Sequence, residues 1–459
     1  MGRLIAAAVT STVALVVVLA LLRLRSGSPD RPAEPPGDGV RTGRVDRDPG
    51  EERAMEMAAL RDAIARELHA NLLPFWRERS LDRERGGFIG EMSNDGSVRA
   101  DAVKGLILNA RLVWTFAALY RALGDTRDRE LATRAYAYLE EHFLDREHGG
   151  YVWRVDRDGR TLDRTKKIYG QAFCVYALAE YHLATGDAGA LAAARRTFEL
   201  IERHAHDEQH RGYLEARAAD WSPTAELRLG DGEPIAAKSM NNHLHLLEAY
   251  TNLYRAWPDA AVGARVRELI ELFATRIVAG GARGGSHLNH FFDEAWRLRS
   301  GTYTYGHDIE ATWLLAEAAR ALGDPLLERS VRDWTNGLAA AVLAEGVDAD
   351  GGLAYEGRDG AVIDGTRDWW CQAEAVVGFW DAWEATGNPS FAAAAAGAWR
   401  FIAATVVDRE NGEWFWRVRA DGTVDPGMPK VSEWKCPYHT TRMCLEMMRR
   451  LDRGAGVTP

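Results

Sequence analysis

The sequence predicts an all-α fold, an (α/α)6 barrel in which six helical hairpins close into a ring, preceded by a single N-terminal transmembrane helix. Three observations lead to this prediction. From about residue 56 onward, apolar residues recur at intervals of three and four, which is the period of helices with one buried face. A glycine-containing phrase returns six times at spacings of 60 to 73 residues, which indicates an internal repeat. Residues 4–22 form an apolar run without charge.

The N-terminal run LIAAAVTSTVALVVVLALL, residues 4–22, is 19 residues long. A helix of this length spans a bilayer, whereas a signal peptide usually has a shorter apolar core and a small-residue cleavage site. Arg23 and Arg25 follow the run directly, and the residues after them form a poor cleavage site. We therefore predict a membrane anchor over residues 1–25, with a cleaved signal peptide and a secreted or periplasmic domain as the alternative. Because Arg3 lies on the other flank, the sequence does not predict the side of the membrane.

Residues 26–53 are rich in Pro, Gly, Asp and Arg, which is typical of a flexible tether. Residues 54–459 then form the predicted barrel domain. A helical repeat cannot bury its apolar face alone, so the six repeats are expected to act as one domain. An open superhelix of helix pairs is the alternative to a closed ring.

Each repeat holds an outer and an inner helical stretch. The outer helices are expected near 54–78, 126–143, 188–205, 260–280, 326–345 and 389–407. The inner helices are expected near 101–122, 167–185, 237–256, 305–322, 368–387 and 431–451. The repeated phrase, as in Gly149-Gly150-Tyr151, follows each outer helix. Its glycines supply positive φ and its aromatic residue packs, so we interpret it as a structural turn.

Composition and motifs exclude several classes of function. The net charge of −10 disfavours a nucleic-acid partner, because proteins that bind polyanions are usually basic. The four cysteines contain no CxxC spacing and are too few for a disulfide framework, which favours buried thiols. The chain has neither a phosphate-binding GxxxxGK[ST] nor a GxSxG in a strand-to-helix context. The 16 tryptophans suit either sugar faces or core packing.

Polar residues stand among apolar ones where each inner helix begins. In a closed ring these helix starts converge at one end of a central funnel, which makes a plausible ligand site. His243 and His245 are two residues apart and cannot share a helix face, so one is expected to face the funnel and the other to pack. His307 and Glu310 are three apart and do share a face, and a carboxylate beside an imidazole raises its basicity. This spacing suits a general base.

Other chemistries fit the sequence less well. His204, His206 and His210 resemble a metal cluster, but their spacing matches no defined zinc signature, so no metal is predicted. A carboxylate pair of a glycoside hydrolase can come from distant segments and stays possible. The combination of histidines, tryptophans and Arg111 suits the removal of a proton next to a sugar carbonyl. Imidazole exchanges protons near neutral pH, and a cation such as Arg111 stabilises the enediolate that forms.

Five phrases in order, NARLVWTF, NHLHLLEAYTNL, GHDIEATWLL, WWCQAEAVVGF and EWKCPYHTTRMCLE, resemble the N-acylglucosamine 2-epimerase superfamily, and most closely its cellobiose 2-epimerases. The resemblance covers about residues 56–451. It implies an (α/α)6 barrel with the site in the funnel. It also implies epimerisation at C2 of the reducing-end glucose of β-1,4-linked disaccharides through a cis-enediolate, without a metal or organic cofactor. Cellobiose would become glucosyl-mannose, and lactose would become epilactose.

The resemblance also implies roles for individual residues. His307 and His439 correspond to the two acid/base histidines, and Glu310 to the carboxylate that supports His307. His245 corresponds to the histidine that helps ring opening, and Arg111 to the residue that holds oxygens of the reacting sugar. The expected substrate-binding residues are Asn241, Tyr169, Trp434 and one or both of Trp369 and Trp370.

Several alternatives remain open at this point. A mannose isomerase would keep the fold and the histidines but return the proton to C1, and an N-acylglucosamine 2-epimerase would need room for an acetamido group. A toroid glycoside hydrolase or lyase and a non-catalytic sugar-binding protein are candidates from other classes. The expected partners are a disaccharide and, through residues 4–22, a membrane. Such an anchor is unusual for this family and puts a cytoplasmic location in doubt.

Overall fold

The computed structural model describes residues 49–230, 232–280 and 286–454. The predicted anchor and residues 26–48 of the predicted tether lie outside the described residues. Residues 49–53, which the sequence analysis assigns to the tether, belong instead to a helix, α2 (Pro49–Glu67). The chain divides into two compact units, Arg66–Glu446 and a smaller one formed by Met1–Ala65 with Met447–Pro459. In the smaller unit, Arg61 Nε donates a hydrogen bond to Asp452 Oδ1 at 3.0 Å.

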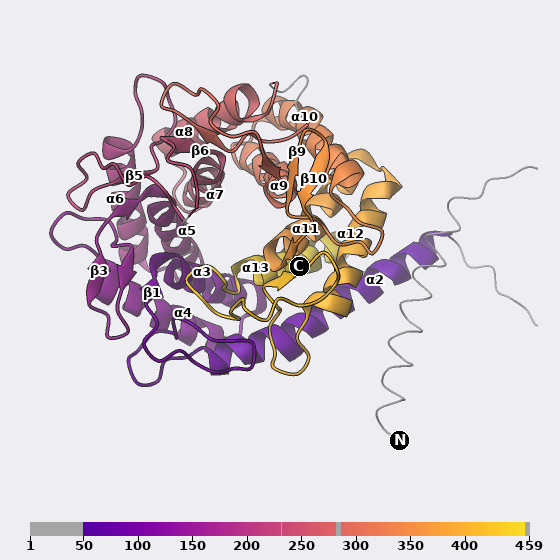
Figure 1. Cartoon of the computed structure of the whole chain (residues 1–459), viewed down its shortest axis with the longest axis horizontal. Coiled ribbons are helices and arrows are strands. Elements are labelled where there is room, and N and C mark those ends of the chain that lie inside the picture. The colour runs from indigo at the N-terminus through magenta and orange to yellow at the C-terminus, as the bar shows by residue number, and fades with distance from the viewer. Residues whose placement is uncertain (1–48, 231, 281–285, 455–459) are drawn as a thin grey trace, which may run out of the picture. The chain divides into compact units, whose positions relative to one another are not determined.

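The described residues form twelve α-helices, and the larger unit has an inner and an outer set (Figure 1). The inner helices are α3 (Leu106–Leu123), α5 (Ile168–Thr185), α7 (Met240–Ala256), α9 (Tyr305–Ala321), α11 (Trp369–Thr386) and the first half of α13 (Tyr438–Gly454). The outer helices are α4 (Thr126–Tyr138), α6 (Ala188–His204), α8 (Ala260–Leu272), α10 (Pro325–Glu345) and α12 (Pro389–Phe401). The π-helical turns are η1 (Leu68–Leu72), η2 (Phe75–Arg79), η3 (Leu139–Phe143), η4 (Phe273–Ile277) and η5 (Ile402–Val406). These elements confirm the predicted alternation of outer and inner helices.

The ring of the larger unit is closed. Each of the inner helices α3, α5, α7, α9 and α11 packs against its neighbour in the series (Figure 1). The two ends of the repeat series also meet, because Trp76 Nε1 donates to Glu413 Oε2 at 2.7 Å and Trp414 Nε1 donates to Glu67 Oε1 at 2.8 Å. The open superhelix that the sequence left as an alternative is therefore wrong.

Local sequence signals explain the tight links from inner to outer helices. Gly124 ends α3 in the left-handed region with φ 75°, a conformation that glycine adopts without steric cost. The next residue, Asp125, caps α4 by accepting the backbone N–H of Arg127. Gly186 and Asp187 end α5 and start α6 in the same way. A Gly-Asp pair thus reverses the chain between two helices that pack side by side.

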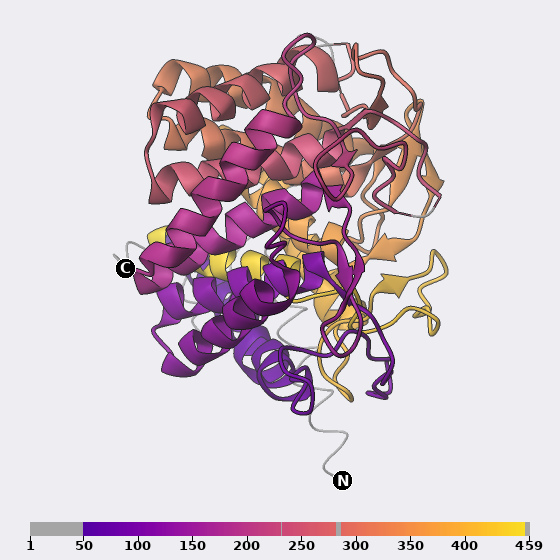
Figure 2. The same cartoon turned by 90° about the vertical axis from the view of Figure 1, so that its left-hand side faces the viewer.

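Short strands join consecutive repeats. They are β1 (Lys104–Gly105), β2 (Arg154–Val155), β3 (Thr161–Asp163), β4 (Lys166–Lys167), β5 (Ala216–Arg217), β6 (Lys238–Ser239), β7 (Phe291–Phe292), β8 (Tyr303–Thr304), β9 (Glu356–Arg358), β10 (Ala361–Asp364), β11 (Arg367–Asp368) and β12 (Arg417–Val418). The strand before an inner helix pairs antiparallel with a strand of the next repeat, as in β1–β2, β4–β5, β6–β7, β8–β9 and β11–β12. Figure 2 shows these strands and the loops around them on one side of the helices.

The repeated glycine phrase forms the predicted turn in the five repeats where the structure describes its glycines, and in the fourth repeat the flanking bridge is described. Each turn is closed by one antiparallel bridge: Leu81–Phe88, Leu144–Tyr151, His206–Tyr213, Val278–Leu288, Val347–Leu353 and Val407–Trp414. Gly150 has φ 69°, and a Cβ atom there would lie 2.8 Å from Gln171 Oε1. Both the backbone conformation and the close approach therefore require glycine at this position.

Some polar residues at the inner-helix starts hold these turns. Lys166 Nζ donates to Asp145 Oδ2 at 2.7 Å, and both side chains are fully buried. Gln171 accepts the backbone N–H of Tyr151 at 2.9 Å and donates to its carbonyl at 2.8 Å. Matching 2.7 Å lysine–aspartate pairs, Lys104–Asp82 and Lys238–Asp207, occur in the neighbouring repeats. These lysines and glutamines belong to the scaffold.

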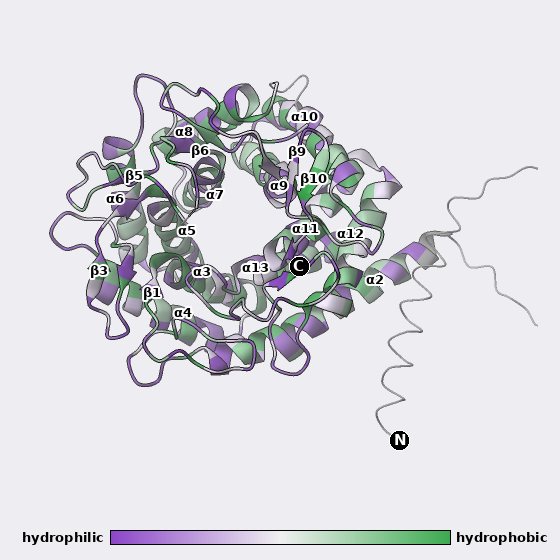
Figure 3. Cartoon of the chain, viewed as in Figure 1, coloured by the Kyte–Doolittle hydropathy of each residue, from purple (hydrophilic) through white to green (hydrophobic). Residues whose placement is uncertain are grey.

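Among the described residues, one helix, α3, is long and apolar enough to cross a membrane. Of its residues, 78% are buried inside the protein, and Figure 3 shows hydrophobic residues along α3 and along its neighbour α5. α3 packs against both α4 and α5, which explains why it is apolar on more than one face.

Candidate active site

The starts of the inner helices bring predicted site residues together at the centre of the ring. Arg111 Nη2 on α3 donates to the Tyr169 hydroxyl on α5 at 2.9 Å. The Tyr169 ring meets the His245 ring on α7 edge-on, with centroids 5.0 Å apart. The Arg111 guanidinium also lies 4.8 Å from the ring centroid of Tyr438, next to His439 on α13. Four inner helices therefore contribute to one cluster.

His439 is held by a carboxylate. Its Nδ1 lies 2.7 Å from Glu374 Oε1, and Glu374 Oε2 also accepts a hydrogen bond from Trp313 Nε1 at 3.1 Å. Because a carboxylate accepts hydrogen bonds, this contact places the hydrogen of neutral His439 on Nδ1. His439 Nε2 then carries the lone pair and has no hydrogen-bond partner within the described residues. A base needs this arrangement.

His307 is held by a hydroxyl. Its Nδ1 lies 2.5 Å from Thr304 Oγ1. Its ring centroid is 4.6 Å from that of Trp370, and Trp370 is 5.6 Å from His439. The fully buried Trp369 packs edge-on against Trp416 instead. Of the two predicted tryptophans, Trp370 is therefore the one in contact with both histidines.

The expected pairing of Glu310 with His307 is wrong as a direct contact. Glu310 Oε1 accepts a hydrogen bond from Arg442 Nη2 at 2.5 Å and lies 4.0 Å from His439 Nδ1. The spacing of three does place both side chains on one helix face. However, His307 reaches back to Thr304, and the carboxylate pairs with a buried cation that the spacing could not indicate.

Arg442 connects the carboxylates behind two histidines. Its Nη1 donates to Glu248 Oε1, and its Nη2 donates to Glu310 Oε1 at 2.5 Å and to Glu374 Oε1 at 2.7 Å. Glu248 Oε2 in turn lies 2.9 Å from His245 Nδ1. The guanidinium is only 3% exposed, so these contacts form away from water.

No role for Glu248, Glu374 or Arg442 was predicted from the sequence, although Glu374 stands among the polar residues where an inner helix begins. Two of them carry a usable signal, since Glu248 follows His245 by three residues and Arg442 follows His439 by three. That spacing places side chains on one face of a helix. Thr304 precedes His307 by three residues in the same way.

The electrostatics of the cluster keep its histidines neutral. Burial lowers the pKa of both His307 and His439 well below 6.5, and nearby cationic or imidazole groups add to the effect. Burial alone would raise the pKa of Glu248, but Arg442 and His245 outweigh it and lower this pKa to about 2. Burial and the neighbouring Glu374 raise the pKa of Glu310. Unprotonated imidazoles are therefore available at neutral pH.

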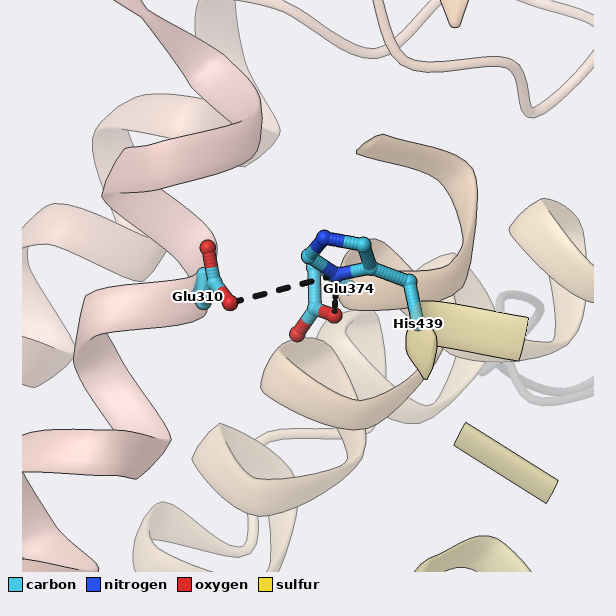
Figure 4. A group of neighbouring side chains, drawn as sticks. All are labelled: Glu310, Glu374 and His439. Atoms are coloured by element: carbon cyan, nitrogen blue, oxygen red, sulfur yellow. Dashed lines mark hydrogen bonds and ion pairs between the residues drawn. The ribbon is translucent and has the colours of Figure 1, made fainter. Parts of the chain in front are cut away.

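The site does not have the character of a metal centre. Ligand atoms of Glu310, Glu374 and His439 lie within 4.8 Å of one another, and Figure 4 shows contacts from the His439 ring to both carboxylates. However, Arg442 Nη2 already bonds to Oε1 of each carboxylate. A fixed guanidinium there would repel a divalent cation.

His204 and His206, which belong to the second histidine cluster of the sequence, have other partners in the structure. His206 Nε2 bonds to Glu268 Oε1 at 3.0 Å, and the His204 ring stacks on Trp221 with centroids 5.3 Å apart. His243 belongs to the scaffold, because its Nε2 accepts the backbone N–H of Tyr213 at 2.9 Å. His245 and His243 thus face different surroundings, as predicted.

The remaining predicted residues flank the cluster. The Trp434 ring is half-buried, with its centroid 6.1 Å from Tyr169 and 6.0 Å from Trp153. Asn241 is also half-buried, and its Oδ1 has no hydrogen-bond partner among the described residues. A half-buried aromatic face and a free amide oxygen suit contacts to a sugar ring and its hydroxyls.

Comparisons with known proteins show which family and which solved structures the chain is similar to. Residues 87–442 match the family model described as N-acylglucosamine 2-epimerase (GlcNAc 2-epimerase). The cellobiose 2-epimerase of Bacteroides fragilis is 43% identical over 390 residues, which cover 85% of this chain and 98% of that protein. The D-mannose isomerase of Marinomonas mediterranea is 25% identical over 401 residues, which cover 83% of this chain and 95% of that protein. The solved structure of cellobiose 2-epimerase from Bacillus thermoamylovorans has a TM-score of 0.81 and 38% identity, and the match covers 86% of this chain and 100% of that one.

Proposed function

The chain belongs to the N-acylglucosamine 2-epimerase family, and we propose that it interconverts glucose and mannose at the reducing end of β-1,4-linked disaccharides. Family membership makes it an isomerase, a carbohydrate 2-epimerase. The proposed substrates are cellobiose, converted to glucosyl-mannose, and lactose, converted to epilactose. Their support is the 43% identity to a cellobiose 2-epimerase, against 25% to a D-mannose isomerase, which makes isomerisation to a ketose the second candidate.

One observation carries the mechanism. His307 and His439 both contact Trp370, each has its Nδ1 hydrogen-bonded, and neither Nε2 has a partner in the described part of the chain. Once the sugar ring opens, C2–H lies beside an aldehyde and becomes acidic. The Nε2 of one imidazole takes this proton and leaves a cis-enediolate. The other histidine takes up a proton from solvent at its Nε2 and donates it to the opposite face of C2, which inverts that carbon, and the first histidine returns the C2 proton to solvent.

The other residues position the sugar and stabilise charge. Arg111 is a buried cation that would stabilise the enediolate oxygens. His245, held by Glu248, would exchange the proton that opening of the hemiacetal ring requires. Trp370 and the half-buried Trp434 would pack against the two sugar rings.

Proton NMR of the full chain in detergent, with cellobiose in deuterated water, tests this function. We expect a mannose-type reducing end that carries deuterium at C2, because the histidine that reprotonates C2 takes its proton from the deuterated solvent. A ketose product would assign the enzyme to the isomerases instead. Free monosaccharide would identify a hydrolase and contradict the proposal. A parallel reaction with lactose should give epilactose.

We further propose that residues 4–22 hold the enzyme at a membrane. The 19-residue uncharged run supports this location. We expect the full chain to sediment with membranes and to resist extraction by alkaline carbonate, whereas a variant that begins at Pro49 should stay in the supernatant. If expression of the full chain instead yields a soluble product whose N-terminus lies after Arg25, the segment is a cleaved signal peptide and the anchor is contradicted.

A further inference from the structure

We infer that His290 is a positioning residue for the reaction: through the Thr304 hydroxyl it keeps a hydrogen on His307 Nδ1, so that His307 Nε2 alone exchanges protons with the sugar. This inference rests on the proposed function for its catalytic meaning. His290 lies after the fourth turn, just before β7, and no feature of the sequence singled it out. Its side chain is 9% exposed.

His290 carries its hydrogen on Nδ1 and a lone pair on Nε2. The backbone N–H of Thr304 donates to His290 Nε2 at 3.1 Å. A backbone amide can only donate, so Nε2 must carry the lone pair. The hydrogen of neutral His290 is therefore on Nδ1. Burial lowers the pKa of His290 to about 4, in agreement with a neutral ring.

The Thr304 hydroxyl lies between the rings of His290 and His307. Thr304 Oγ1 lies 3.3 Å from His290 Nε2 and 2.5 Å from His307 Nδ1. The hydroxyl has one hydrogen to donate and can accept others. The one lone pair of His290 Nε2 is shared by two donors, because the backbone N–H of Thr304 lies 3.1 Å away and its hydroxyl can also direct its hydrogen there. The hydroxyl oxygen then accepts from His307 Nδ1–H. The relay runs from His307 to Thr304 and on to His290.

The hydrogen on His307 Nδ1 determines which nitrogen of this ring can act on the sugar. While Nδ1–H donates to Thr304, His307 Nε2 is unprotonated in the neutral ring and protonated in the imidazolium, which are the two states that proton exchange with C2 requires. Without an acceptor at residue 290, the hydroxyl is free to rotate and donate to His307 Nδ1. The hydrogen of His307 then moves to Nε2, and the base is lost. His439 needs no such relay, because Glu374 accepts directly from its Nδ1.

Two matched pairs of variants test the relay. His290→Phe removes the acceptor, while His290→Gln offers the Gln Oε1 in place of Nε2. Thr304→Val removes the hydroxyl at nearly constant volume, while Thr304→Ser keeps it. We expect kcat for cellobiose to fall about tenfold or more in the Phe and Val variants, with KM within about twofold, because a positioned base contributes about 10²–10⁴-fold. The Gln and Ser variants should recover most of kcat.

A second measurement does not depend on turnover. Long-range ¹H–¹⁵N NMR of histidine-labelled full chain reports which ring nitrogen carries hydrogen, and the His307→Asn spectrum assigns the His307 signal. We expect Nδ1–H in the wild type and in Thr304→Ser, and a shift toward Nε2–H in His290→Phe. Thermal unfolding checks that each variant folds.

Two results would overturn the relay: an unchanged His307 tautomer in folded His290→Phe, or equal kcat losses in Thr304→Val and Thr304→Ser. Failure of the wild type to epimerise any disaccharide would instead count against the proposed function. The NMR measurement on the free enzyme would still decide whether the relay exists.

Discussion

Replacement of His439 by Asn is expected to lower kcat/KM for cellobiose epimerisation by about 10²–10⁴-fold, the usual contribution of a positioned acid or base. The Asn amide can still donate to Glu374, which bonds to His439 Nδ1 at 2.7 Å in the wild type, but it offers no basic nitrogen in place of Nε2. His307→Asn should have a comparable effect. Product formation by NMR gives the rates, and calorimetry should show that cellobiose still binds. Wild-type turnover in either variant would refute the acid/base assignment.

Exchange of the C2 hydrogen distinguishes the two histidines. Suppose that each histidine serves one face of C2. A variant that keeps one histidine should then still exchange the C2 hydrogen of the epimer in which that hydrogen points toward the remaining histidine. His307→Asn and His439→Asn should therefore lose exchange with opposite members of the pair cellobiose and glucosyl-mannose. Loss of exchange with the same epimer in both variants would contradict a two-base mechanism.

The fold could be predicted because its signals are local and repeated. The 3.6-residue period located the helices, and the six glycine phrases located the turns, which the bridges from Leu81–Phe88 to Val407–Trp414 confirm. The inner helices begin a few residues later than predicted in some repeats. One example is α13, which starts at Tyr438 instead of near 431. Closure of the ring depends on contacts between residues far apart in the sequence, such as Trp76 and Glu413. No local sequence pattern predicts such contacts.

The candidate site could be predicted only in part. The structure brings His307 and His439 against Trp370, and Arg111 against Tyr169, as convergence of the helix starts implied. The spacing of residues along the sequence could not predict which hydrogen-bond partner each side chain has. Spacing also could not indicate His290, which lies in a loop outside the inner-helix starts.

Replacement of Arg442 by Met is expected to destabilise the protein by about 3–5 kcal/mol, the usual cost of removing one partner of a buried ion pair. Met fills much of the volume but leaves Glu248, Glu310 and Glu374 without their shared donor. Urea unfolding would measure the loss. Arg442→Lys is the control for charge, and it should recover only part of the stability, because an ammonium cannot match the planar contacts of a guanidinium to three carboxylates. Wild-type stability of Arg442→Met would refute the central role of this residue.

The destabilisation should depend on pH with a defined sign. Because the folded-state pKa of Glu248 is about 2, below its ordinary 4.5, its pairing stabilises the fold above pH 4.5 and this contribution is lost as the pH falls toward 2. Arg442→Met removes the pairing, so the difference in unfolding midpoint between wild type and variant should be largest near neutral pH and should shrink below pH 4.5. A difference that grows on acidification would contradict this account.

A double-mutant comparison identifies which carboxylate makes the loss of Arg442 costly. Burial and Glu374 raise the pKa of Glu310, so Glu310→Gln alone removes little charge and should cost less than Arg442→Met. In the Arg442→Met background, the same change removes one of the buried acids that has lost its donor, and it should restore part of the stability. Glu248→Gln in that background should restore more, because Glu248 depends most on Arg442 for its charge. Additive losses in both double variants would mean that neither Glu310 nor Glu248 is energetically coupled to Arg442.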